Sequence, residues 1–82
     1  MGNIVPHMEQ FNANDLLIFA RVADTGSFSR AAEQLDLPKS TLSRRISLLE
    51  ERLGERLLLR STRRLSLTDY GQQLLEHARQ VA

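Results

Sequence analysis

The sequence contains no cysteine among its 82 residues. Disulfide bridges and metal sites with thiolate ligands are therefore excluded. No uninterrupted apolar run approaches the roughly 18 residues that a membrane-spanning helix requires, and no secretory signal peptide is recognisable. We therefore expect a cytoplasmic protein that works without a metal, a cofactor or a membrane.

The first seven residues, MGNIVPH, precede a second methionine, Met8, and show no periodicity. We interpret them as a leader left by cloning and expect the natural chain to begin at Met8. His77 is then the one remaining histidine, with Glu76 as its only acidic neighbour in sequence. We interpret it as solvated or as part of a dimer seam rather than as a ligand.

Groups that carry out catalysis are also scarce. A domain of this size buries only about 60% of its unfolded surface, which leaves room for one interaction surface but little for a deep active site. The chain has no glycine-rich phosphate loop and no clustered carboxylates. We therefore predict that it is not an enzyme and has no catalytic residues.

Charge is segregated along the chain, although the net charge is only +1. Residues 39–64 contain eight basic and three acidic residues, whereas the rest of the chain contains three basic and seven acidic ones. This pattern indicates a polyanionic partner on one face of the molecule.

Apolar spacing predicts two helices before the basic segment. The first has Asn14 as its N-cap and stops at Thr25-Gly26, and Ser27 is the candidate N-cap of the second, shorter helix. The apolar positions at i, i+3, i+4 and i+7 are Leu16, Phe19, Ala20 and Ala23 in the first helix, and Phe28, Ala31, Ala32 and Leu35 in the second.

A longer third helix follows a break at residues 35–38, and Gly54 is suitably placed to end it. Two short strands, 57–59 and 65–67, are separated by the basic turn 60–64 and predict a hairpin. The apolar stripe of the third helix consists of Leu42, Ile46, Leu49 and Leu53.

Thr68 is the expected N-cap of a final helix over residues 68–82. Gly71 lies early in this helix, where it costs roughly 1 kcal/mol relative to alanine. Helix, short helix, break, longer helix, hairpin and helix is the order of a winged helix-turn-helix. We predict a mainly α fold of this kind over residues 8–67, with the helix-turn-helix at about 28–47 and a two-stranded wing at about 57–67.

The polar face of the third helix suits DNA. Small hydroxyl side chains let a helix approach base edges closely, and arginine can pair bidentately with guanine. Base contacts concentrate in the first turn of a recognition helix. A purely solvated face is the alternative, which the short second helix and the basic hairpin disfavour. Opposite the apolar stripe lie Ser40, Ser43, Arg44 and Ser47, with Lys39 at the leading end, and we assign Lys39, Ser40, Thr41, Ser43 and Arg44 to DNA.

The order of charges in this helix gives a second argument. Lys39 lies near the N-terminus, and Glu50 and Glu51 lie near the C-terminus, so all three oppose the helix dipole. Helix stability alone would favour the reverse order. A DNA duplex at the N-terminal end would explain both placements.

Further basic residues flank this face. Arg45 lies off the stripe and could contact phosphate or fold back onto the second helix. The wing arginines Arg60, Arg63 and Arg64 suit a minor groove or phosphates, although Arg60 borders a strand and could instead hold the wing in place. Residues 63–66 also fit a basic kinase-substrate pattern, a short match that often arises by chance.

Two residues at the start of the second helix have alternative roles. Ser27 can cap the helix, and the N-terminus that it caps can also donate amides to a phosphate. We include it among the DNA-contacting residues. Phe28 is interpreted as a core residue rather than as one that stacks on a base.

The runs GSFSRAAEQL, LSRRISLLEERLGERLL and RSTRRLSLTDYG resemble the N-terminal DNA-binding domain of LysR-type transcriptional regulators. The resemblance covers about residues 12–82. Its markers are Ala31-Ala32, Ser43, Ile46, Leu49-Glu50, Leu53-Gly54, Leu57-Leu58, Arg60, Thr68 and Gly71.

This resemblance implies a bacterial regulator that acts as a homodimer, or as a tetramer when full-length, on DNA with two half-sites. A small-molecule effector would bind a further domain after residue 82. Residues 68–82 would form a linker helix that pairs antiparallel with that of a second subunit. Its implied dimer residues are Leu74, Leu75, Ala78 and Val81, its base-reading positions are Lys39, Ser40, Ser43 and Arg44, and its minor-groove arginine is Arg63.

Lys39 departs from the family pattern, which often has glutamine at this position, so the family's base preference does not carry over to it. Our leading prediction is sequence-specific binding of double-stranded DNA that regulates transcription. The alternative is a winged-helix module that binds a protein through the same basic face.

Overall fold

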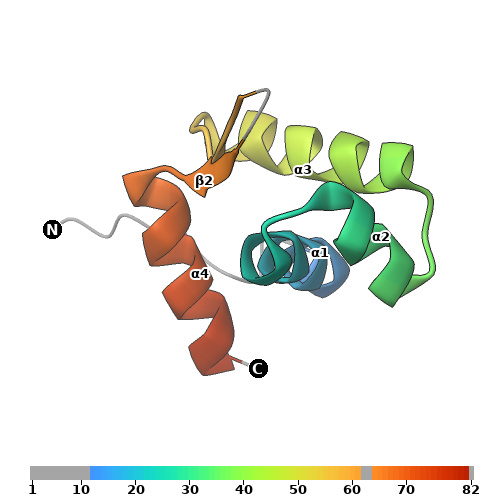
Figure 1. The fold of residues 1–82 in the computed structure, drawn as a ribbon. Coiled ribbons are helices and arrows are strands. Elements are labelled where there is room, and N and C mark those ends of the chain that lie inside the picture. The colour runs from blue at the N-terminus through green and yellow to red at the C-terminus, as the bar shows by residue number, and fades with distance from the viewer. Residues whose placement is uncertain (1–11, 62–63, 82) are drawn as a thin grey trace, which may run out of the picture.

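The computed structural model of the protein describes residues 12–61 and 64–81, apart from the side chain of Val81. It has the predicted mainly α architecture, a winged helix-turn-helix followed by a last helix. In Figure 1, α3 and α4 lie on different sides of α1, and α1 contacts all three other helices. The elements in chain order are α1 (Ala13–Thr25), α2 (Phe28–Leu35), α3 (Lys39–Leu53), β1 (Leu58–Arg60), β2 (Leu65–Leu67) and α4 (Asp69–Val81).

Helix α1 begins earlier than the sequence predicts. Its N-cap is Asn12, whose side-chain oxygen accepts a hydrogen bond from the backbone N–H of Asn14 at 2.8 Å. The prediction of Asn14 as the cap is wrong because Asn12 already satisfies the first free amides of the helix. The buried apolar residues of α1 are Leu16, Ile18, Phe19 and Val22.

The helix-turn-helix pair, α2 and α3, has the predicted position. Ser27 is the N-cap of α2 and accepts a hydrogen bond from the Arg30 N–H at 3.1 Å. Asp36, with φ of 57°, ends α2 in a left-handed conformation, and Pro38 precedes α3 without a side-chain cap. The fixed φ of proline suits the start of a helix. Gly54, with φ of 69°, ends α3 as predicted.

The wing is a two-stranded antiparallel hairpin shifted by one residue from its predicted first strand. Leu58 pairs with Leu67, and Arg60 pairs with Leu65. Arg60 therefore belongs to β1 rather than to the turn. The Ser61 N–H donates to the Arg64 carbonyl at 2.9 Å and the Arg64 N–H donates to Ser61 Oγ at 3.0 Å, which closes the turn.

Thr68 joins α4 to the wing and caps the helix as predicted. Its Oγ1 accepts a hydrogen bond from the Gly71 N–H at 2.9 Å and donates to the Arg56 carbonyl at 2.6 Å. Gly71 is buried, and a Cβ atom placed there would lie 2.2 Å from the Leu57 carbonyl oxygen. The glycine that lowers helix propensity is therefore what allows α4 to pack against the chain entering β1.

The apolar side of α4 is part of the protein's own core. Leu74, Leu75 and Ala78 are 0%, 4% and 8% exposed in a single chain. The interpretation of these residues as a surplus apolar face is wrong, because Leu74 and Leu75 lie in one core cluster with the buried residues of α1. That they pair two subunits stays a prediction. The prediction for Val81 concerns a side chain outside the described residues.

Candidate nucleic-acid interface

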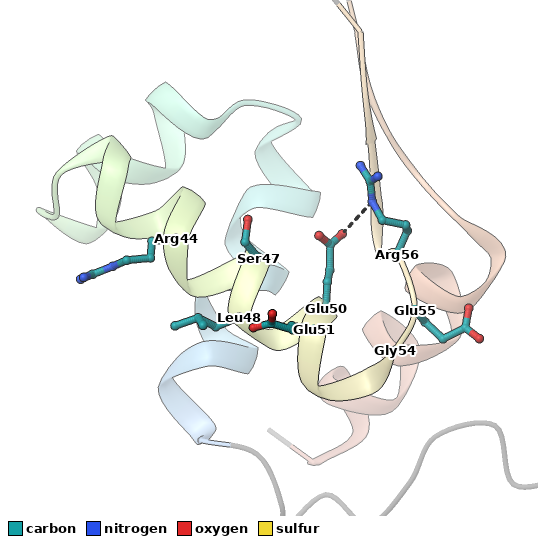
Figure 2. Close-up of a pocket in the computed structure, with 8 residues that line it drawn as sticks. All are labelled: Arg44, Ser47, Leu48, Glu50, Glu51, Gly54, Glu55 and Arg56. Atoms are coloured by element: carbon teal, nitrogen blue, oxygen red, sulfur yellow. Dashed lines mark ion pairs between the residues drawn. The ribbon is translucent and has the colours of Figure 1, made fainter.

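Helix α3 separates its core stripe from a polar stripe, as the spacing predicts. Leu42, Ile46 and Leu49 are at most 2% exposed. On the other side, Lys39, Ser40, Arg44 and Ser47 are exposed, and Thr41 and Ser43 are half-buried. Arg44 extends away from the body of the domain (Figure 2).

An open hollow lies between the start of α2, the start of α3 and the wing. Three cations from different segments line it: Lys39 from α3, Arg60 from β1 and Arg64 from the turn. Its other lining residues are Gly26, Ser27, Phe28, Ser29, Ser61 and Leu65. The structure thus brings together the predicted residues Ser27, Lys39, Arg60 and Arg64, which the sequence separates by up to 37 positions.

Ion pairs divide the basic residues into two groups. Arg45 pairs with Asp15 at 3.0 Å, Arg56 with Glu50 at 3.8 Å, and Arg79 with Asp24. Within residues 12–61 and 64–81, no ion pair involves Lys39, Arg44, Arg60 or Arg64. The cations around the hollow and on the polar stripe therefore have no acidic partner in the described part of the chain. Arg63 lies outside the described residues.

Arg45 folds back onto the protein, but onto α1 rather than the second helix. Its Nη1 donates to Asp15 Oδ1 at 3.0 Å, and Asp15 is only 8% exposed. A buried carboxylate needs such a partner. The sequence could not reveal this pair, because Asp15 reads equally well as a favourable acidic residue in the first turn of α1.

Replacing Arg45 by alanine should destabilise the domain. The charges of the polar stripe stay the same, because Arg45 is not part of it. We expect Arg45→Ala to lower the unfolding free energy by about 1 kcal/mol, a value reduced because the Arg45 side chain is 42% exposed. Urea unfolding followed by circular dichroism measures this loss. Arg44→Ala, one residue away and exposed, should change stability by less than about 0.5 kcal/mol. Equal effects of the two substitutions would contradict the structural role of Arg45.

Glu50 has a role that the sequence did not indicate. Its Oε2 accepts hydrogen bonds from the backbone N–H groups of Leu57 at 2.8 Å and Leu58 at 3.2 Å. Figure 2 shows the same carboxylate directed toward Arg56. Glu50 therefore attaches the first residues of the wing to the end of α3. These amides, and not DNA as the sequence suggested, account for the position of Glu50 near the end of α3.

Arg60 contacts both helices of the helix-turn-helix. Its guanidinium carbon lies 4.6 Å from the centroid of the Phe28 ring, and its Nη1 donates to Ser43 Oγ at 3.4 Å. Phe28 itself packs against the hydrophobic core, as predicted. Arg60 thus contacts α2 and α3 from the wing, which is the second of the two roles that the sequence left open for it.

Residues 12–61 and 64–81 contain no group of three or more potential metal ligands. No helix in this part of the chain is long and apolar enough to cross a membrane. Burial, with a smaller contribution from the charge of Glu55, raises the pKa of Tyr70 above its ordinary value, and Tyr70 lies outside the hollow.

Comparison with known proteins places the fold in a family. Residues 13–72 match the family of bacterial regulatory helix-turn-helix proteins of the lysR type. An HTH-type transcriptional regulator from Xanthomonas campestris is 52% identical over 69 residues, which are 84% of this chain and 20% of that protein. The transcriptional regulator CrgA from Neisseria meningitidis is 49% identical over 70 residues, which are 85% of this chain and 23% of CrgA. The chain thus spans about a fifth of the length of these relatives.

Solved structures agree with this assignment. The structure of BenM_DBD with catB site 1 DNA has a TM-score of 0.84 and 34% identity, covering 87% of this chain and 79% of that one. The CbnR_DBD–DNA complex has a TM-score of 0.83 and 35% identity, covering 87% and 82%. The relatives from Xanthomonas campestris and Neisseria meningitidis are transcriptional regulators, in agreement with the prediction of a regulator rather than an enzyme. The chain belongs to the LysR family of bacterial regulatory helix-turn-helix proteins.

Proposed function

We propose that this domain binds double-stranded DNA sequence-specifically, with α3 in the major groove and the wing at the neighbouring minor groove. The observation that carries the proposal is the set of three cations without acidic partners among the described residues, Lys39, Arg44 and Arg64, on α3 and the wing. A phosphate backbone supplies the missing negative charge. The similar domains of BenM and CbnR were solved as complexes with DNA.

Each residue of this surface has a proposed role. The first two turns of α3 read bases, with Arg44 as the bidentate partner of a guanine. Ser27 and Arg64 border the hollow and contact phosphates. Arg45 is not part of the proposed interface, because Asp15 already binds it. The remaining base-reading residues are Lys39, Ser40, Thr41 and Ser43, and Arg63 is the proposed minor-groove residue.

The whole protein is proposed to be a cytoplasmic bacterial transcription regulator with an effector-binding domain beyond this chain. It would act as a homodimer on two half-sites, since DNA-binding domains of this type read short sites in pairs. The solvent-exposed side of α4, rather than Leu74, Leu75 and Ala78, is available for pairing the subunits. Its exposed residues include Gln72, Gln73, Glu76, His77 and Gln80.

Salt dependence tests the phosphate contacts. The plot of log K against log salt concentration has a negative slope. Each phosphate contact that is removed should make this slope less steep by about 0.9. We therefore expect Arg64→Ala to decrease the steepness of the slope by about this amount for any duplex. Arg52→Ala, in the last turn of α3 and exposed, should leave the slope unchanged. If wild type is retained on no duplex but binds acidic proteins, the winged-helix interaction module is the correct function.

Base reading by Arg44 predicts a different pattern. On the preferred site, selected from random duplexes, Arg44→Ala should weaken binding about tenfold or more, since one bidentate arginine–guanine pair discriminates by about 1–3 kcal/mol. On random duplexes the loss should be much smaller and comparable to that of a phosphate contact. Fluorescence anisotropy with both duplexes measures the ratio. An equal loss on the two duplexes would rule out base reading by Arg44.

A further inference from the structure

The wing needs support to hold a fixed position beside α3. Its strands have three residues each, and an isolated two-stranded hairpin of this size is not stable in water. Glu50 attaches its beginning, through the amides of Leu57 and Leu58. The other end of β1 is Arg60, and its contacts with Phe28 and Ser43 lead to the helix-turn-helix.

The two contacts of Arg60 differ in strength. A guanidinium 4.6 Å from a ring centroid lies within the distance at which the ring attracts a cation. The hydrogen bond to Ser43 Oγ, at 3.4 Å, is longer than usual. The ring therefore provides most of the attachment, and the contact with Ser43 directs the guanidinium toward the polar stripe of α3.

We propose that Arg60 is a positioning residue that fixes the wing against α2 and α3 through the Phe28 ring, and is not a phosphate contact. This inference rests on the proposed DNA binding and deepens it. The wing and α3 contact the same duplex, so a fixed spacing between them reduces the conformational freedom that binding must remove. Phe28 serves both the core and the interface in this arrangement.

Charge-preserving substitutions separate the two roles. Lysine keeps the positive charge that a phosphate needs but loses the planar group that stacks on a ring. We expect Arg60→Lys to weaken binding to the preferred duplex about 2- to 5-fold, with an unchanged salt slope. Arg52→Lys, the matched control at an exposed arginine in the last turn of α3 and outside the proposed interface, should retain full affinity.

A double-substitution cycle identifies the ring as the partner. Phe28→Leu keeps an apolar side chain in the core while removing the ring face, and circular dichroism checks that it folds. We expect it to weaken binding to about the same extent as Arg60→Lys, and the double variant to bind no more weakly than either single one. Full affinity of Arg60→Lys, or additive losses in the cycle, would overturn the inference.

The contact can also be observed without DNA. In the NMR spectrum of the free protein, the ring current of Phe28 should shift the Arg60 side-chain resonances, and Phe28→Leu should abolish that shift. An unshifted Arg60 in wild type would overturn the positioning role even if the protein binds DNA. A shifted Arg60 in a protein that no duplex retains would instead overturn the proposed function.

Discussion

Glu50→Ala is expected to destabilise the domain by about 2–3 kcal/mol, because hydrogen bonds to a charged group are stronger than neutral ones. The carboxylate accepts two backbone N–H groups, those of Leu57 and Leu58, and its side chain is only 12% exposed. Alanine leaves both amides without this acceptor, at a site to which water has little access. The ion pair with Arg56 adds little, since it is 3.8 Å long and Arg56 is 66% exposed.

Urea unfolding of three variants tests this prediction. Glu51→Ala is the matched control, since Glu51 is the exposed neighbour in the same helix, and its effect should stay within about 0.5 kcal/mol. Glu50→Gln keeps an acceptor oxygen without the charge. Its loss of unfolding free energy should lie between those of Glu50→Ala and Glu51→Ala. Specific DNA affinity should decrease for Glu50→Ala as well, because the wing loses its attachment to α3. If the unfolding midpoint of Glu50→Ala equals that of wild type, the amides of Leu57 and Leu58 find other partners.

Gly71→Ala is expected to destabilise the domain although it improves helix propensity. Propensity alone predicts a gain of roughly 1 kcal/mol. The added Cβ, however, would lie 2.2 Å from the Leu57 carbonyl oxygen, which also accepts the Thr68 N–H at 3.0 Å. The oxygen cannot move aside without weakening that bond, so we expect a net loss of about 1–3 kcal/mol, as for other overpacked sites.

The sign of the effect decides this prediction. Gln73→Ala, at an exposed position of the same helix, should be neutral or slightly stabilising. In thermal unfolding, the midpoint of Gly71→Ala should therefore be lower than that of wild type. The midpoint of Gln73→Ala should be unchanged or slightly higher. A raised midpoint for Gly71→Ala would mean that α4 can move away from the wing at little cost.

Local sequence information was sufficient for the helices and for most of their ends. The apolar spacing of residues such as Leu42 and Ile46 identified the buried stripe of α3, and the opposite stripe followed from the same period. Ser27, Gly54 and Thr68 marked helix ends because capping depends on residues only a few positions apart. The one-residue shift in β1 occurred because a hairpin register depends on the partner strand, which the local pattern of three leucines does not specify.

The family resemblance implied that the apolar side of α4 pairs two subunits. The apolar residues of α4 alone could not show that Leu74 and Leu75 pack in the chain's own core. The helix they pack against, α1, lies about 50 residues earlier in the sequence. Burial depends on which elements pack together, and this is not a property of one helix.

The sequence by itself determined which residues could face DNA, because helical period, hydroxyl content and segregated charge are all local properties of residues 39–64. Only the tertiary structure decided which arginines remain available for it. Arg45 is bound by Asp15, and Arg60 contacts Phe28, whereas Arg44 has no acidic partner among the described residues. The physical reason is that a charge acts on whatever lies within a few ångströms in space, and those neighbours come from segments 30 or more positions apart in the sequence.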